Sequence, residues 1–375
     1  MLSTSRRLIV VTICLLVISV VVAACGSDEG STSTEAGNEQ DVTTEGVQAD
    51  GSGGTDAAEE SFDFEKLVAA AEEEGEVDIV STLKDEEVAP VIEAFNKEYP
   101  NIAVNHSRDH GAAAQERLMR ELASDADVPD IVQIHGDYED IFVKVMDVLA
   151  SANWEQDYGV IPEIVSGSNR LVAPAAFAYV FAYNNELVDS EEAPQTWEDL
   201  LDPKWKGRLI VDTRPNAFLY LAGEWGAEKT VEYAAKLGEQ DPIFVRGQTE
   251  NLGLMGAGEY ELAATAYLSS ANYVKMQGGP ISWNFPNPIP MDWMKLAVLK
   301  KADHPNAARL LLGWLGSEGY KEIAKANLGR AIPFGDTEVA RQAEQQGVSF
   351  PPSMSEMDDR QAFQSDVLEA LGVQQ

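Results

Sequence analysis

The sequence predicts an α/β protein made of two lobes, each with helices packed against a sheet that contains parallel strands. Short apolar runs typical of strands alternate with amphipathic runs typical of helices from residue 62 to residue 327. The joints between these runs are short, and no segment repeats with a fixed period. Repeated strand–helix units with short joints are typical of parallel sheets, so we expect open α/β sheets rather than a solenoid or a helical bundle.

In the first half of the chain, the run FDFEKLVAAAEEEG predicts a helix at 62–75, because apolar residues recur at helical spacing and Gly75 is a common helix end. The run EVDIVSTL predicts a strand at 76–83. Pro100 ends the next helix, whose acidic first turn suits the helix dipole. The remaining elements expected here are helices at 85–100, 111–126 and 137–151 and strands at 101–107 and 129–134.

The second half repeats the alternation. The apolar run AFAYVFAYN predicts a strand at 176–184, and RLIVD predicts another at 208–212. The remaining strands are expected at 261–268 and within 291–302, and the helices at 196–207, near Ala217, at 230–239 and over 305–327.

The amino-terminal segment has the pattern of a signal peptide. Arg6 and Arg7 precede an uncharged apolar stretch, 8–24, which ends in small residues. The ending VAAC resembles the lipobox of bacterial lipoproteins, in which the cysteine becomes the first mature residue and carries the lipid. We therefore expect a signal peptide at 1–24 and lipidation of Cys25, with a plain membrane anchor as the alternative.

The segment that follows is expected to be a disordered acidic tether at 25–60. Residues 26 to about 60 are rich in Ser, Thr, Gly, Asp and Glu and contain no Lys or Arg, so they bury too little apolar surface to offset the entropy of ordering. The chain has only 2 cysteines, Cys14 and Cys25. The domain beyond the tether therefore has no disulfide and no cysteine for metal binding or catalysis.

Charge excludes one class of partner. The formal net charge is −36 at pH 7. Nucleic acid needs a basic surface, so we expect no nucleic-acid partner, and an anionic bilayer surface is disfavoured for the same reason.

Several strings identify a family. The run YNNELVDSEEAPQTWEDLLDPKWKGRLIVD at 183–212 resembles the periplasmic solute-binding proteins of ABC importers, of the ferric-binding-like type 2 group. VIEAFNKEYPNIAV at 91–104 is similar to the opening helix and strand of that family. LAVLKKADHPNAARLLLGWLGSEGYKEIA at 296–324 is similar to its strand-to-helix return. Together these blocks cover about residues 75 to 335.

The resemblance implies a two-lobe type 2 periplasmic-binding-protein fold with a ligand cleft between the lobes. Crossing segments are expected near 170–180 and near 268–285. The implied boundaries are lobe 1 at 61–172, lobe 2 at 173–271, a return to lobe 1 at 272–325, and carboxyl-terminal helices on lobe 2 at 326–375.

Candidate ligand residues stand at joints where a strand ends and a helix begins. Open α/β sheets bind ligands beyond the carboxyl ends of their strands, and helix N-termini there favour anions. Helix capping is the alternative role for each Ser, Thr or Asn. The candidates are Ser81, Thr82, Lys84, His110, Gly111, Ala112, His135, Gly136, Thr213, Arg214, Asn216, Tyr267, Ser269 and Ser270.

The chemistry at these joints favours a small organic anion or zwitterion, such as a phosphonate, a sugar phosphate or a carboxylate. Ferric-binding relatives carry two adjacent tyrosines after the strand expected here at 261–268, whereas in this sequence Leu268 follows Tyr267. Lys84 stands near the place of a family histidine, and a protonated lysine is not a metal ligand. Ferric iron remains the alternative cargo, with Tyr267 and His135 as its ligands.

No nucleophile elbow, zinc-protease motif, phosphate-binding loop or dinucleotide fingerprint occurs, so we expect a binding protein without cofactor, and a tethered hydrolase is the second alternative. The resemblance implies a permease and its ATPase subunit as partners. We expect a monomer outside the cytoplasmic membrane, held there by lipid on Cys25.

Overall fold

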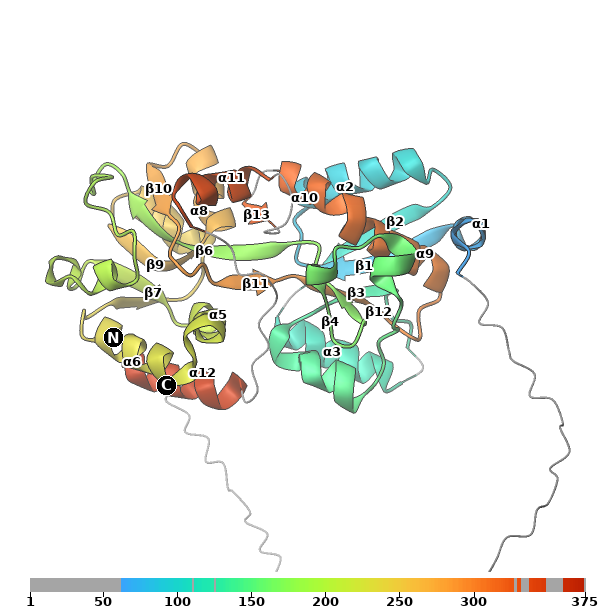
Figure 1. Ribbon diagram of the computed structural model, residues 1–375, viewed down its shortest axis with the longest axis horizontal. Coiled ribbons are helices and arrows are strands. Elements are labelled where there is room, and N and C mark those ends of the chain that lie inside the picture. Colours follow the sequence, from blue (N-terminus) through green and yellow to red (C-terminus); the bar gives the residue numbers. More distant parts are fainter. Residues whose placement is uncertain are drawn as a thin grey trace, which may run out of the picture. The chain divides into compact units, whose positions relative to one another are not determined.

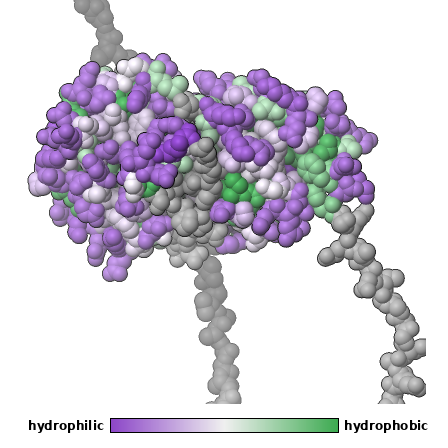
Figure 2. Space-filling view, turned by 45° about the horizontal axis from the view of Figure 1, so that its top comes forward, coloured by the Kyte–Doolittle hydropathy of each residue, from purple (hydrophilic) through white to green (hydrophobic). Residues whose placement is uncertain are grey.

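The computed structural model describes residues 62–109, 111–124, 126–326, 329–331, 337–348 and 360–373. The expected signal peptide, Cys25 and the tether lie outside these residues, as does His110. Among the described helices, none has the length and apolarity needed to cross a membrane. The face drawn in Figure 2 is mostly hydrophilic, as the formal net charge of −36 leads one to expect.

Lobe 1 is built on one sheet with the strand order β2-β1-β3-β12-β5-β4 (Figure 1). β1 pairs with β2 and β3 in parallel, and β12 pairs antiparallel with β3 and β5. The strands are β1 (Glu76–Ser81), β2 (Ala103–Arg108), β3 (Ile131–Ile134), β4 (Val165–Ser166), β5 (Leu171–Val172) and β12 (Lys295–Val298). The helices are α1 (Phe64–Glu74), α2 (Asp85–Glu98), α3 (Ala112–Leu122), α4 (Trp154–Tyr158), α9 (Pro305–Trp314) and α10 (Tyr320–Lys325).

Lobe 2 has the strand order β10-β6-β9-β7-β8, and β11 and β13 pair with one end of β6. β6 carries an almost unbroken apolar sequence because it is buried between β10 and β9. The strands are β6 (Ala176–Asn184), β7 (Leu209–Asp212), β8 (Ile243–Val245), β9 (Leu262–Tyr267), β10 (Ile281–Asn284), β11 (Met291–Trp293) and β13 (Arg330–Ala331). The helices are α5 (Asn216–Trp225), α6 (Ala227–Gly238), α7 (Thr249–Gly256), α8 (Leu268–Met276), α11 (Glu338–Gln345) and α12 (Arg360–Leu371). The mixed α/β class with two sheets is confirmed.

Among the described elements, the chain changes lobe three times. The first crossing leads from β5 in the lobe 1 sheet into β6, and the second leads from β11, paired with β6, into β12 of lobe 1. The third leads from α10 of lobe 1 to β13, which pairs with β6. The expectation of a second crossing near 268–285, with a return to lobe 1 from 272, is wrong. Residues 281–284 form β10, which pairs with β6, so the chain leaves lobe 2 only after Trp293. The expected strand within 291–302 is in fact two strands, one on each side of this crossing.

The helix predicted at 137–151 forms only in its first part, as an irregular helical stretch that ends at Val145. The chain forms a 3₁₀ turn at Gly136–Tyr138 and a short π-helix at Ile141–Val145, and Leu149 then bridges to Leu299. Asp147 adopts a φ of 49°, which ends any right-handed helix. Sheet pairing of the residues after it overrides the helical periodicity.

At the carboxyl end, α12 packs against α6. Phe363, Val367 and Leu371 are buried in the same apolar cluster as Tyr233 and Leu237 of α6. The last described helix therefore belongs to the lobe 2 core.

Candidate functional site

The joint after β1 is mostly committed to local structure. Ser81 is fully buried, and its Oγ lies 3.0 Å from His106 Nε2 and accepts from the backbone N–H of Leu83. Thr82 donates from both its backbone N–H and its Oγ1 to Gln133 Oε1, at 2.8 and 2.9 Å. These bonds fix the carboxyl end of β1 to β3, so Ser81 and Thr82 shape the joint.

Lys84 reaches across to the other lobe. Its ammonium nitrogen lies 4.3 Å from the centroid of the Tyr273 ring on α8. A cation at this distance over an aromatic face is attracted by the ring quadrupole. This contact joins the start of α2 in lobe 1 to α8 in lobe 2. The resemblance implies that the ligand binds between these two lobes.

The joints after β2 and β3 form a second group in lobe 1. Gly111 adopts a φ of 81° and caps α3, whose first residue is Ala112. Gln115 donates to the carbonyl oxygen of Gln133 and accepts from the backbone N–H of His135, which links α3 to the end of β3. Gly136 begins the 3₁₀ turn. These bonds fix the position of α3 relative to the carboxyl end of β3.

In lobe 2, the joint after β7 holds a paired arginine. Arg214 donates from Nε and Nη2 to the two carboxylate oxygens of Asp212, at 2.9 and 2.6 Å. This hydrogen-bonded pair raises the pKa of Arg214 despite partial desolvation, so its charge is permanent and already compensated. Asn216 is the first residue of α5, and the N–H of Thr213 bonds to the carbonyl of Val245.

Tyr267 lies at the centre of a hydrogen-bonded cluster. Its hydroxyl donates to Asp292 Oδ2 at 3.0 Å and accepts from the hydroxyl of Tyr179 at 2.9 Å. Tyr220, on α5, donates to the other carboxylate oxygen of Asp292 at 2.6 Å. Burial raises the pKa of Tyr267 well above its ordinary value, and the charge of Asp292 raises it further, while Arg214 opposes the shift. The phenol is therefore protonated in the absence of a bound ion.

Of the two serines after Tyr267, Ser270 is buried and its Oγ lies 3.2 Å from Thr249 Oγ1. Ser269 is partly exposed in the first turn of α8. Ser270 therefore ties α8 to α7, and Ser269 is the one that stays accessible.

The crossing strands place three side chains in a row. Phe177 on β6 is the register partner of Asp292 on β11 at one edge and of Arg330 on β13 at the other. Directly opposed residues in a sheet project from the same face, so Arg330, Phe177 and Asp292 lie side by side. The Arg330 guanidinium stacks 4.2 Å from the centre of the Phe177 ring, and that ring lies 5.1 Å from the ring of Tyr267.

Arg330 also ties the two lobes together. Its Nε bonds to Glu87 on α2, and its Nη atoms lie within 3.4 to 3.5 Å of the Thr82 oxygens. Both partners of the ion pair are buried, with 6% and 2% of their side chains exposed. Gly329, directly before Arg330, lets the chain pass close to the start of α8, because a Cβ there would lie 2.9 Å from a side-chain carbon of Leu268, and its φ of 70° favours glycine.

Arg108 ends β2 beside this row. It is exposed, and no carboxylate within the described ranges pairs with its guanidinium. Burial lowers the pKa of Arg330, Glu87 opposes that effect, and the nearby charge of Arg108 lowers the pKa further. The register partner of Arg108 in β1 is Ser81, the residue before the Thr82 that Arg330 contacts, so a paired and an unpaired guanidinium belong to the same joint.

Sequence reasoning missed several members of this site. The missed residues are Arg108, Phe177, Tyr179, Tyr220, Asp292 and Arg330. Arg108 had a usable signal, because it directly precedes the joint at 109–111 and the expected strand ended one residue too early. The others become neighbours only through strand pairing between distant segments, for which the sequence contains no local pattern.

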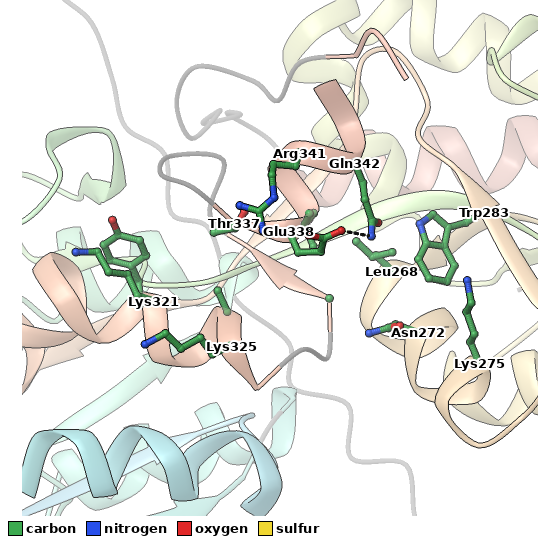
Figure 3. Close-up of a pocket in the computed structure, with 14 residues that line it drawn as sticks. Leu268, Asn272, Lys275, Trp283, Lys321, Lys325, Thr337, Glu338, Arg341 and Gln342 are labelled. Atoms are coloured by element: carbon green, nitrogen blue, oxygen red, sulfur yellow. Dashed lines mark hydrogen bonds and ion pairs between the residues drawn. The ribbon is translucent and has the colours of Figure 1, made fainter. Parts of the chain in front are cut away.

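A cavity of about 750 Å³ lies elsewhere, between α10 of lobe 1 and α8, β10 and α11 of lobe 2 (Figure 3). Its lining includes the cations Lys275, Lys321, Lys325 and Arg341. None of the described candidate residues lines it. The cavity is therefore a second possible site, separate from the cluster around Tyr267.

The cations of the cavity already have local partners. Lys321, Lys325 and Arg341 each pair with a glutamate three residues earlier on the same helix, and Lys275 lies 4.7 Å from the centre of the Trp283 ring. Such exposed pairs are weak and mobile. The cluster around Tyr267 and the adjoining Arg330, in contrast, consist of buried and partly buried groups that are fixed by hydrogen bonds from both lobes, so we take them as the candidate site.

Comparison with known proteins fits this architecture. The family model for bacterial extracellular solute-binding proteins matches residues 81–322. Solved structures with a similar fold include iron-bound HitA from Pseudomonas aeruginosa, with a TM-score of 0.58, 19% identity, and coverage of 79% of this chain and 97% of that one. Another is AfuA from Actinobacillus pleuropneumoniae with fructose-6-phosphate bound, with a TM-score of 0.58, 18% identity and coverage of 80% and 99%.

A third is the spermidine/putrescine substrate-binding protein PotD from Streptococcus pneumoniae, with a TM-score of 0.61, 15% identity and coverage of 79% and 98%. At these identities the likeness shows the fold alone. The family match spans more than half of the chain and its family consists of binding proteins rather than enzymes. The chain belongs to the bacterial extracellular solute-binding protein family and has the type 2 periplasmic-binding-protein fold.

Proposed function

We propose that this solute-binding component of an ABC importer captures a small organic anion or zwitterion at the cluster around Tyr267. The candidate contacts are Arg108 and Thr82 from lobe 1, Tyr267 and Asn216 from lobe 2, and Arg330 on the strand between them. The lobes close on the solute in a hinge motion, and its higher affinity for the closed state drives that motion.

One observation supports this choice most strongly. Arg108 is an exposed guanidinium without a carboxylate partner in the described part of the chain, and its register partner Ser81 precedes the Thr82 that the buried Arg330 contacts. Its guanidinium N–H donors therefore face solvent, where they can bind an anionic group of a solute by charge-assisted hydrogen bonds.

A thermal-shift panel tests the proposal. The full chain, purified in mild detergent, is heated with phosphonates, sugar phosphates, dicarboxylates, 4-aminobutyrate, polyamines and ferric citrate. A solute at a hundred times its dissociation constant adds about 2.7 kcal/mol of stability, which raises the Tm by several degrees. The proposal predicts a shift with an organic anion or zwitterion, and a shift with polyamines alone would contradict it.

Ferric iron is a second candidate cargo, and one observation favours it. Tyr267 and Tyr220 bond to the same carboxylate, Asp292, so two phenols and a hard oxygen ligand meet at one point. Against this, burial and the charge of Asp292 hold the pKa of Tyr267 high, and iron binds the phenolate. The other expected iron ligand, His135, is not part of this cluster: it follows β3 in lobe 1, where its backbone N–H donates to Gln115. A visible phenolate-to-iron charge-transfer band on adding ferric citrate would establish iron as the cargo.

We also propose that lipid on Cys25 holds the protein at the outer face of the cytoplasmic membrane, where it delivers its solute to a permease and its ATPase subunit. Residues 1–24 supply the export signal and 25–60 the tether. Labelling with a radioactive fatty acid in a bacterial host tests this. Label should enter the wild-type chain and be lost in Cys25→Ser, and equal labelling of both would contradict the proposal.

A further inference from the structure

Asp292 is the carboxylate of the site that lacks a cationic partner. Its two oxygens accept from the Tyr220 and Tyr267 hydroxyls, at 2.6 and 3.0 Å, and no lysine or arginine among the described residues forms an ion pair with it. Its neighbours differ in this respect, because Asp212 is paired with Arg214 and Glu87 with Arg330.

Two neutral hydroxyls do not compensate a carboxylate charge. Each carboxylate oxygen has two lone pairs and uses one of them here, so acceptor capacity remains on both oxygens. Asp292 is also partly exposed to solvent rather than sealed in the core. The carboxylate can therefore accept a hydrogen bond from a ligand, and a cationic donor gives the strongest one.

The opposite charge lies at the other end of the same row. Asp292, Phe177 and Arg330 occupy successive strands, so the outer two backbones are about 10 Å apart, which is twice the spacing of neighbouring strands. The Arg330 guanidinium is held by Glu87 and Thr82, and the exposed Arg108 is the register partner of Ser81, the residue next to Thr82. The site thus has a negative end on β11 and a positive end beside β13, separated by aromatic rings.

We propose that the solute is a zwitterion that lies along this row, with its ammonium group at Asp292 and its anionic group at Arg108. This inference rests on the proposed function and narrows it, because a simple anion would leave Asp292 without a partner and a polyamine would leave Arg108 without one.

Matched pairs of probes test the inference by isothermal titration calorimetry on the full chain. The pairs are 4-aminobutyrate with butyrate, and 3-aminopropylphosphonate with propylphosphonate, so that each pair differs by one amino group. We expect the amino member of at least one pair to bind 10-fold tighter or more. In Asp292→Asn that ratio should fall to near one, and in Arg108→Ala both members of the pair should bind weakly.

Glu338→Gln, which removes a carboxylate in the cavity of Figure 3, is the matched control and should keep the wild-type ratio. If Asp292→Asn lowers the Tm but leaves the ratio unchanged, Asp292 is structural and the inference is overturned. Equal binding of amino and desamino members overturns the inference and leaves the proposed function standing. If no organic anion or zwitterion in the wider panel binds, the proposed function fails with it.

Discussion

The cluster around Tyr267 and the cavity between α8, α10 and α11 both contain several charged residues, yet they are built differently. In the cluster, partners come from segments far apart in sequence, such as Glu87 with Arg330 and Tyr267 with Asp292. In the cavity, lysines and arginines pair with glutamates one helical turn away. The volume of a cavity is therefore a weaker indication of a binding site than charged side chains held in place by partners from distant segments.

This difference has an energetic meaning. Buried groups that are held in place before the ligand arrives lose little freedom on binding, whereas long exposed side chains lose rotamer entropy. Breaking a buried pair also leaves an uncompensated charge, while breaking an exposed pair lets water replace the partner. Substitutions in the cluster should therefore change the free energy of unfolding or the solute affinity more than substitutions in the cavity do.

The largest effect is expected from Arg330→Met. Loss of this guanidinium leaves Glu87 buried without its partner, which costs about 3–5 kcal/mol. Urea denaturation should show the loss as a lower midpoint. Lys325→Met in the cavity should change the free energy of unfolding by no more than about 0.5 kcal/mol. Adding Glu87→Gln to Arg330→Met should restore part of the stability. Similar urea midpoints for Arg330→Met and Lys325→Met would contradict the difference between the two regions.

A smaller effect, on binding rather than stability, is expected from Arg108→Ala. A hydrogen bond to a charged group contributes about 1.5–3 kcal/mol, so solute affinity should fall by about 10- to 150-fold. The Tm of the free protein should stay the same, because Arg108 is exposed and has no carboxylate partner in the described ranges. Lys321→Ala is the control from the cavity. If it weakens binding as much as Arg108→Ala does, the solute lies in the cavity instead.

Tyr267→Phe should destabilise the protein by about 1–2 kcal/mol, because the Tyr179 hydroxyl loses its acceptor and Asp292 loses a donor. Thermal unfolding of the solute-free protein measures this. Tyr320→Phe at the cavity provides a comparison and should be close to neutral. An unchanged Tm in Tyr267→Phe would mean that water replaces the lost hydroxyl and that the cluster is not preorganised.

The smallest effect is a pH dependence at a third place, the far end of lobe 1. Burial lowers the pKa of His304, but the hydrogen bond and charge of Asp130 outweigh it, so the pKa is raised from 6.5 in the folded protein. Stabilisation from the protonated ring should be fully present below pH 6.5 and be lost as the pH rises through the raised pKa. His304→Gln should flatten that part of the Tm–pH curve by a degree or two, and an unaltered curve would count against the pair.

Much of the fold could be predicted from the sequence because its signals are local. Apolar periodicity and Gly or Pro at element ends predicted the helix ending at Gly75 and the strand that became β6, both of which the structure contains. The errors, namely the second half of the helix at 137–151 and the crossing near 268–285, concern segments whose structure depends on pairing with distant strands.

In the candidate site too, features with a local sequence signal could be predicted, whereas features that depend on pairing between distant strands could not. The sequence by itself determined the α/β class, the family and the position of Tyr267, Thr82 and Arg214 at strand ends. Only the tertiary structure decided that Arg214 is neutralised by Asp212, and that Asp292, Phe177 and Arg330 form one row across β11, β6 and β13. The physical reason is that side-chain periodicity is set within a strand, whereas the register between strands is set by the packing of the whole sheet.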